Sequence, residues 1–286
     1  MPTKNTNGSD GKHRLGLTFH RTFSLSRSAV SQILQVAEKI ELQGSKKLDL
    51  KSITEFASLG SIYIEAMPRY ARGSGLLNSK GFLTELGRLA NKYDSLLDQS
   101  GTQWLMHYHL SAPHGPGAPF WHEVVSNRFY PGSVFSADDL VEQIGNFIWE
   151  TENKILSERA VRSTVTVFLG TYTKPEGLGK LRMLEDTDSG RYRVREPAPP
   201  PNWAVGYALL DFWEAHYSGR LSVGLDTLQE SGFPGLFFMG KADLDEALQV
   251  LQEAHYLELH RTAPPYQVVL LRQDREFLLH KLYGTN

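Results

Sequence analysis

The stretch Leu251–Arg272, "LQEAHYLELHRTAPPYQVVLLR", determines the fold that we expect for the C-terminal part of the chain. Apolar residues recur at helical spacing over 244–251, after Asp243, which is placed to cap a helix. Apolar residues then alternate over 256–259, "APPYQ" makes a turn, and "VVLL" follows as a second apolar run. The order helix, strand, turn, strand predicts the C-terminal half of a winged helix.

The tip of this predicted hairpin is a candidate nucleic-acid contact. Arg261 is expected to meet a phosphate and Thr262 to donate to one, and contacts of this kind position a protein on DNA without reading its sequence. The alternative is a solvent-exposed hairpin that braces a neighbouring domain, because the tip is not unusually basic. The residues that would project from the tip are His260, Arg261, Thr262, Tyr266 and Gln267.

The N-terminal part predicts a second module of the same kind over residues 15–98. Helices are expected over 27–42, 49–58 and 60–71, followed by the hairpin-like "GLLNSKGFLTELG". Three helices of this length also occur as simple packing units, so this alternative stays open. Residues 1–14 are polar and are expected to form a disordered tail.

The remaining segments complete a mainly α fold. Residues 99–173 predict a helical middle, and 174–201 a linker, with glycines, a triple proline and a hairpin near 189–196. Residues 202–286 form the C-terminal winged-helix-like module. Polar residues that are expected to cap helices are Ser26 or Ser28, Asp49, Ser136 and Ser157.

Composition narrows the class of protein. The chain of 286 residues has no cysteine, so disulfides, thiolate metal sites and thiol nucleophiles are excluded. No apolar run approaches the roughly 18 residues of a membrane span, and the N-terminus has no secretory signal, so we expect a cytoplasmic protein without membrane contact. A net charge of -2 requires that any DNA-binding surface be a local patch.

No motif of a familiar enzyme class is present, and we predict a protein without catalytic activity, metal or cofactor. GxxxxGK[ST], GxSxG and HExxH are absent, and no GxGxxG follows a strand. A metal-dependent enzyme is the third-ranked alternative, because imidazole is a common metal ligand. The spacing of the candidate ligands does not suit a metal site, since residues two apart on a helix face different sides. The candidate ligands are His107, His109, His114, His122 and Glu123.

Short motifs in a fixed order resemble a known bacterial family, the domain of unknown function numbered 4007. The segment Asp-x-x-Leu followed by Thr-x-Trp-Leu-x-His-aromatic is matched by Asp94, Leu97, Thr102, Trp104, Leu105, His107 and Tyr108. Further segments similar to the family lie at His20, Thr22, Phe23, Trp121, Asn127, Phe129, "FLGTY", "GYALLDFWE", Arg261, Thr262 and Ala263. The resemblance extends over residues 15–275.

One segment departs from the family pattern. The family has Lys and Asn in the helix before "RY", whereas this chain reads "LGSIYIEAMPRY". DNA reading by the first unit would therefore fall to Arg69, Tyr70 and Arg72.

The resemblance implies a DNA-binding or adaptor subunit of a DNA-modification and anti-phage defence system linked to DNA phosphorothioation. Its implied partners are double-stranded DNA and a sulfur-transfer enzyme resembling phosphoadenosine-phosphosulfate reductase. The alternative is a protein–protein adaptor that docks this enzyme without touching DNA. The residues expected to contact phosphates are Arg69, Arg72, Lys80, Arg261 and Gln267.

Overall fold

The computed structural model describes residues 14–187 and 190–285, and this part of the chain is mostly helical with two small antiparallel sheets. The prediction of a mainly α protein is confirmed at this level. Except for Arg14, the predicted tail lies outside the described residues. No described helix is long and apolar enough to cross a membrane.

Four helices make up the N-terminal part: α1 (Arg27–Leu42), α2 (Leu50–Phe56), α3 (Tyr63–Gly73) and α4 (Glu85–Tyr93). The Ser26 and Asp49 side chains accept hydrogen bonds from the first turns of α1 and α2, so these predicted caps are confirmed. Between α3 and α4 the described chain forms only the single bridge Leu77–Leu83, not the predicted wing. The Asn78 side chain closes a tight turn there, and α4 begins too soon for a strand ladder to form.

The middle part contains a sheet that was not predicted. Its elements are α5 (Ser100–Ser111), α6 (Pro119–Arg128), β1 (Val134–Ser136), α7 (Ala137–Glu152), α8 (Glu158–Thr173), η2 (Gly179–Leu181), β2 (Leu184–Thr187) and β3 (Arg191–Val194). A hairpin is present here, but it is formed by β2 and β3, so only its second strand lies within the expected range 189–196; β3 also pairs with β1. Two segments of the predicted linker, Leu184–Thr187 and Arg191–Val194, therefore belong to this sheet. The sequence did not predict β1, because three residues are too few to show an alternating pattern.

The C-terminal part confirms the helix–strand–turn–strand prediction, with α11 (Lys241–Glu253), β5 (Leu257–His260) and β6 (Gln267–Leu270). Asp243 contributes to the cap of α11 from within the helix, by accepting from the backbone N–H of Gly240. The other elements are α9 (Asn202–His216), β4 (Ser222–Gly224), α10 (Leu225–Glu230), η3 (Pro234–Phe237) and α12 (Arg275–Leu282).

The middle and C-terminal parts repeat one order of elements. From α6 to β3, and again from α9 to β6, a helix is followed by a strand, two helices and a hairpin. In both sheets the first strand pairs with the third, giving the orders β1-β3-β2 and β4-β6-β5. The repeated unit thus occupies the middle and C-terminal parts, whereas the sequence placed it at the two ends.

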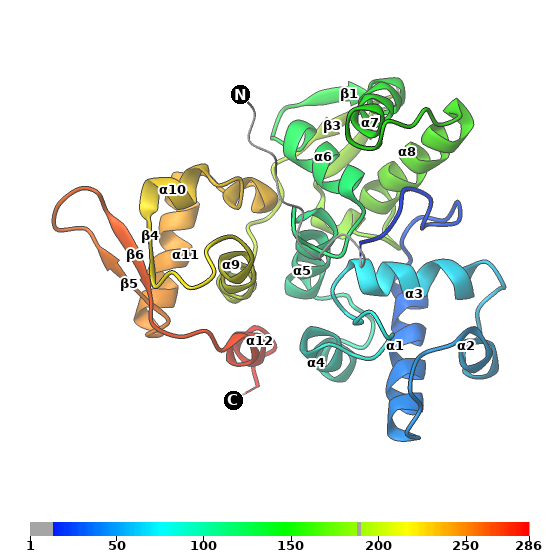
Figure 1. Cartoon of the computed structure of the whole chain (residues 1–286), viewed down its shortest axis with the longest axis horizontal. Helices are drawn as coiled ribbons and strands as arrows, with labels where there is room; N and C mark the ends of the chain where they lie inside the picture. Colours follow the sequence, from blue (N-terminus) through cyan, green and yellow to red (C-terminus); the bar gives the residue numbers. More distant parts are fainter. Residues whose placement is uncertain (1–13, 188–189, 286) are drawn as a thin grey trace.

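Helix α5 lies at the centre of the molecule, between α9 on one side and the N-terminal and middle helices on the other (Figure 1). All its residues from Gly101 to Ser111 are buried. Tyr108 stacks on Phe237 with ring centroids 5.7 Å apart, and the Thr102 hydroxyl pairs with the Tyr283 hydroxyl at 2.9 Å. The family-like motif on α5 is therefore part of the core that joins the three parts of the molecule.

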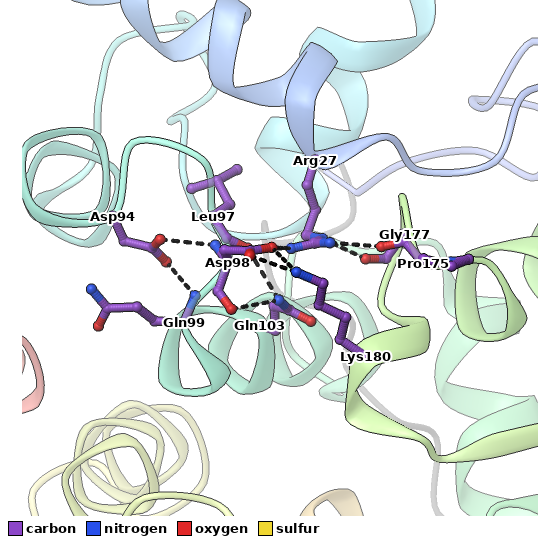
Figure 2. Close-up of polar contacts among 9 residues, drawn as sticks. All are labelled: Arg27, Asp94, Leu97, Asp98, Gln99, Gln103, Pro175, Gly177 and Lys180. Atoms are coloured by element: carbon purple, nitrogen blue, oxygen red, sulfur yellow. Dashed lines mark hydrogen bonds and ion pairs between the residues drawn. The ribbon is translucent and has the colours of Figure 1, made fainter.

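A buried arginine fixes the start of α1 against two loops (Figure 2). The Arg27 guanidinium donates to backbone carbonyls from the loop after α8 and the loop before α5, and it pairs with the Asp98 carboxylate. Lys180 reaches the same carboxylate at 2.5 Å. The carbonyls that accept from Arg27 belong to Leu97, Pro175 and Gly177.

Candidate functional site

Three arginines line one hollow between α3 and the loop that precedes α1. This hollow, which we call the arginine hollow, has a volume of about 510 Å³ and contains Arg14, Arg69 and Arg72. No acidic residue is among the side chains that line it, and the other lining residues are Leu15, Gly16, Thr18, Phe19 and Ser79.

The charges of these arginines are not neutralised by the part of the chain that the structure describes. Arg14 donates to the Gly117 carbonyl at 3.4 Å, and Arg69 to the Phe19 carbonyl at 3.2 Å. The Arg72 side chain has neither a hydrogen bond nor an ion pair within residues 14–187 and 190–285. Neither Arg14 nor Arg69 has a carboxylate of these residues within ion-pair distance.

Burial lowers the pKa of Arg14 from its usual value. Burial and, to a smaller extent, the charge of Arg69 lower the pKa of Arg72. Arginine nevertheless stays charged at neutral pH. The arginine hollow therefore gathers like charges that repel each other, and a bound anion would relieve this repulsion.

Two further hollows continue from the first. One, of about 450 Å³, shares Arg69 and Arg72 with the arginine hollow and extends to Lys80 and Arg21. Arg21 is paired with Glu65 at 3.0 Å, so this extension is less basic. The other, of about 330 Å³, reaches from Arg21 to Arg159 near the start of α8 and has no acidic lining residue.

A fourth hollow, which we call the junction pocket, opens beside Arg72 and Ser79, which it shares with the arginine hollow. It has a volume of about 430 Å³ and lies where the turn between α3 and α4 meets α5, α9 and α12. Polar residues in its lining include His109, His114, Tyr207, Asp211 and Arg275.

Asp211 is the centre of a polar network beside the junction pocket. Its carboxylate lies 2.9 Å from His114 Nε2, 3.0 Å from the Tyr108 hydroxyl and 2.5 Å from Arg275 Nη1. Burial by itself would raise the pKa of Asp211, but the hydrogen bond from His114 and the charge of Arg275 outweigh it and hold the pKa well below the usual range. His114 Nδ1 is 3.0 Å from His216 Nε2, and the network is satisfied when His216 donates to His114 and His114 to Asp211.

The histidines considered as metal ligands have separate roles. His107 is fully buried, with Nδ1 2.8 Å from the Tyr172 hydroxyl and Nε2 2.9 Å from the Leu236 carbonyl. Burial lowers the pKa of His107 to about 4. His122 Nδ1 contacts the Ser111 carbonyl at 2.8 Å. Within the described ranges, no three His, Asp or Glu side chains are grouped so as to hold a metal ion.

The predicted contact residues at the C-terminal tip are spread over a surface with little free positive charge. Arg261 pairs with Asp245 at 2.9 Å, and His260 contacts Glu258 at 3.0 Å. Thr262 and Tyr266 are exposed. Gln267 lies opposite His260 in the β5–β6 ladder.

Tyr70, which the sequence placed beside Arg69 and Arg72 as a contact, is not at the surface. Its side chain is completely buried, its ring packs on Phe19 with centroids 4.9 Å apart, and its hydroxyl donates to the Phe23 carbonyl at 2.9 Å. Sequence reasoning also missed Arg14, which it assigned to the tail. No local sequence pattern identifies Arg14 as a site residue, because it lines the same hollow as Arg69 only once its loop has folded against α3.

Two solved structures resemble the chain in fold. A crystal structure of SspB with bound magnesium ion has a TM-score of 0.75 and 19% sequence identity, over 97% of this chain and 91% of that one. A second crystal structure of SspB has a TM-score of 0.73 and 19% identity, over 94% and 88% of the two chains. At this identity the likeness shows a shared fold. No curated protein matches the chain.

The family model "Protein of unknown function (DUF4007)" matches residues 64–283, from α3 to the end of α12. The matched region includes Arg69, Arg72 and the whole of the repeated unit in both its copies. The chain therefore belongs to the DUF4007 family.

Proposed function

We propose that this protein is a DNA-binding subunit of a bacterial DNA-modification and anti-phage defence system linked to DNA phosphorothioation, and that it holds duplex DNA for partner enzymes. The observation that carries the proposal is the arginine hollow, which three arginines line and where none of them has a described carboxylate within ion-pair distance. Phosphate groups recur at regular spacing along the DNA backbone, and a guanidinium group can bind a phosphate through two hydrogen bonds.

The neighbouring hollows extend this basic surface toward α8. Arg21 and Arg159 line the small hollow that contains the start of α8, and Lys80 lines the one between α2 and α3. The repeated unit of the middle part has the element order that we expected of a winged-helix-like module, and α8 is its last helix before the hairpin. In helix-turn-helix proteins the second helix of the motif enters the major groove. We infer that α8 and the arginine hollow face the same duplex.

Contacts to phosphates depend strongly on salt. Three phosphate contacts correspond to a slope of about -2.7 for the logarithm of the association constant against the logarithm of the salt concentration. The test is the fluorescence anisotropy of a labelled 30-base-pair duplex, titrated with the protein at salt concentrations from 50 to 300 mM. We expect binding that weakens with this slope, and a flat response or no binding at 50 mM contradicts the proposal.

An adaptor role that does not require DNA is the second candidate, and the C-terminal unit favours it. Helix α11 carries one lysine, Lys241, against four acids, and the nearby Arg261 is already paired with Asp245. A surface of this charge repels DNA and suits a basic protein surface. Co-purification of a sulfur-transfer enzyme by the full chain, together with an absence of DNA binding at low salt, would favour this candidate. The acids are Asp243, Asp245, Glu246 and Glu253.

A further inference from the structure

The junction pocket contains two polar side chains that are buried and lack partners. Tyr207 is 8% exposed and His109 is 7% exposed, and both line the pocket. Within residues 14–187 and 190–285, no hydrogen bond reaches the Tyr207 hydroxyl or either ring nitrogen of His109. Their rings lie edge to face with centroids 5.8 Å apart. Of these atoms, His109 Nε2 is fully shielded from solvent, and a buried polar atom without a partner is rare in folded proteins because it loses its bonds to water.

These two groups offer defined hydrogen-bonding capacity. Burial raises the pKa of Tyr207, so its hydroxyl remains protonated at neutral pH and can donate. Burial lowers the pKa of His109, so its imidazole is neutral and has one donor and one acceptor nitrogen. A ligand that fits them must therefore carry both acceptors and donors on one edge.

The remaining walls favour a flat, uncharged ligand. Leu77, Pro116 and Leu279 supply apolar surface. The acidic lining residues Asp211, Glu85 and Glu276 stand against the basic residues Arg72 and Arg275, so the pocket has no excess of positive charge to favour an anion. A volume of about 430 Å³ is far larger than one water molecule or ion requires. A nucleobase has apolar faces and a polar edge with donors and acceptors, and carboxylates accept hydrogen bonds from base amino groups.

Arg72 connects this pocket to the phosphate-binding surface, since it lines both the junction pocket and the arginine hollow. We propose that the junction pocket receives one nucleobase, unstacked from the DNA whose phosphates lie in the arginine hollow. This inference rests on the proposed DNA-binding function. Unstacking a base costs free energy, and the cost is smallest for a mismatched base.

The test compares two 30-base-pair duplexes, each with one central 2-aminopurine, either paired with thymine or mismatched with cytosine. Anisotropy of an end label reports binding, and 2-aminopurine fluorescence reports unstacking. We expect roughly tenfold tighter binding of the mismatched duplex, because its base leaves the stack more easily, with a rise in 2-aminopurine fluorescence on binding. Equal affinities with unchanged fluorescence overturn the inference and leave the proposed function standing, whereas no binding of either duplex overturns both.

Three variants test whether the preference for the mismatched duplex depends on the junction pocket. Glu276 lies at the rim on α12 with its side chain 60% exposed, so Glu276→Trp is expected to cover the pocket and remove the mismatch preference while retaining binding of the paired duplex. Glu253→Trp places the same side chain on exposed helix surface outside the pocket and is expected to keep the preference. Tyr207→Phe removes only the hydroxyl and is expected to reduce the preference several-fold. A preference that survives both Glu276→Trp and Tyr207→Phe overturns the inference.

Binding of free 2-aminopurine deoxyribonucleoside 5′-monophosphate tests whether the base in the junction pocket comes from DNA or from a soluble nucleotide. We expect no binding of this nucleotide at 100 μM, because it lacks the flanking phosphates that the arginine hollow holds. Saturable binding of the free nucleotide that Tyr207→Phe abolishes, without a mismatch preference in DNA, would instead assign the pocket to a soluble nucleotide and overturn the inference.

Discussion

Arg69 and Arg72 line the same hollow, and the charge of Arg69 contributes to lowering the pKa of Arg72. Neither arginine has a described carboxylate within ion-pair distance, so the two cations repel each other, and an anion bound between them would relieve this repulsion. The Arg72 side chain also makes no internal hydrogen bond to the described chain. A half-buried arginine whose guanidinium has neither a hydrogen bond nor an ion pair within the described chain is a candidate for binding an anion.

The variant Arg72→Ala is expected to weaken DNA binding without destabilising the fold, because Arg72 has no partner among the residues described. Loss of one phosphate contact should reduce the magnitude of the salt slope by about 1. Arg220→Ala removes the same charge from an exposed position outside the four hollows and serves as the control. An identical salt slope for the wild type and Arg72→Ala would exclude Arg72 as a phosphate contact.

The variant Asp211→Asn is expected to destabilise the protein by about 3 kcal/mol, since it leaves the half-buried His114 without its carboxylate and Arg275 with the exposed Glu214 alone. Because Arg275 belongs to α12 and Asp211 to α9, we expect the attachment of α12 to loosen first. Urea denaturation at pH 7.5 measures the loss. Asp138→Asn, which removes a carboxylate that is 76% exposed and paired with Arg162, should cost less than about 1 kcal/mol. Equal losses for the two variants would contradict the prediction.

Stability is expected to fall between pH 7.5 and pH 5 in part because of His107. Burial lowers its pKa to about 4 in the folded protein, from 6.5 in the unfolded chain, so the unfolded state binds more protons in this window. The free energy of unfolding should decrease by about 2 kcal/mol from this residue alone. The variant His107→Gln should lose this part of the decrease in the free energy of unfolding between pH 7.5 and pH 5. The control His260→Gln, which replaces an exposed histidine, should show the same decrease as the wild type. Urea midpoints at the two pH values give the comparison, and an unchanged pH dependence in His107→Gln would refute the assignment.

Gly87 allows α4 to pack directly on the preceding turn. A Cβ atom at this position would lie 1.9 Å from the Leu76 carbonyl oxygen, so Gly87→Ala must displace backbone and should cost at least about 2 kcal/mol. Gly145, inside α7, has open space around the corresponding position, and Gly145→Ala should stabilise the protein by about 0.5–1 kcal/mol. Thermal unfolding of the two variants should therefore shift in opposite directions. A Gly87→Ala melting temperature equal to that of the wild type would show that this contact is not tight.

The sequence by itself determined the features that depend on neighbouring residues. The caps at Ser26, Asp49, Ser136 and Ser157 were predicted because each side chain bonds to a backbone group three residues ahead. The C-terminal hairpin was predicted for the same reason, since an alternating stretch, a short turn and a second apolar run follow one another directly in the chain. The motifs on α5 identified the family.

Only the tertiary structure decided which charges are free. Arg69, Arg72 and Arg261 are equally basic in the sequence, but Arg261 pairs with Asp245 whereas Arg69 and Arg72 line a hollow together with Arg14. These encounters join residues that are distant in the chain, so they follow from the packing of whole elements and leave no local pattern. For the same reason the sequence does not reveal the junction pocket, whose walls come from four separate segments of the chain. Packing of whole elements also places Tyr70 inside the core, although its neighbour Arg69 lines the arginine hollow.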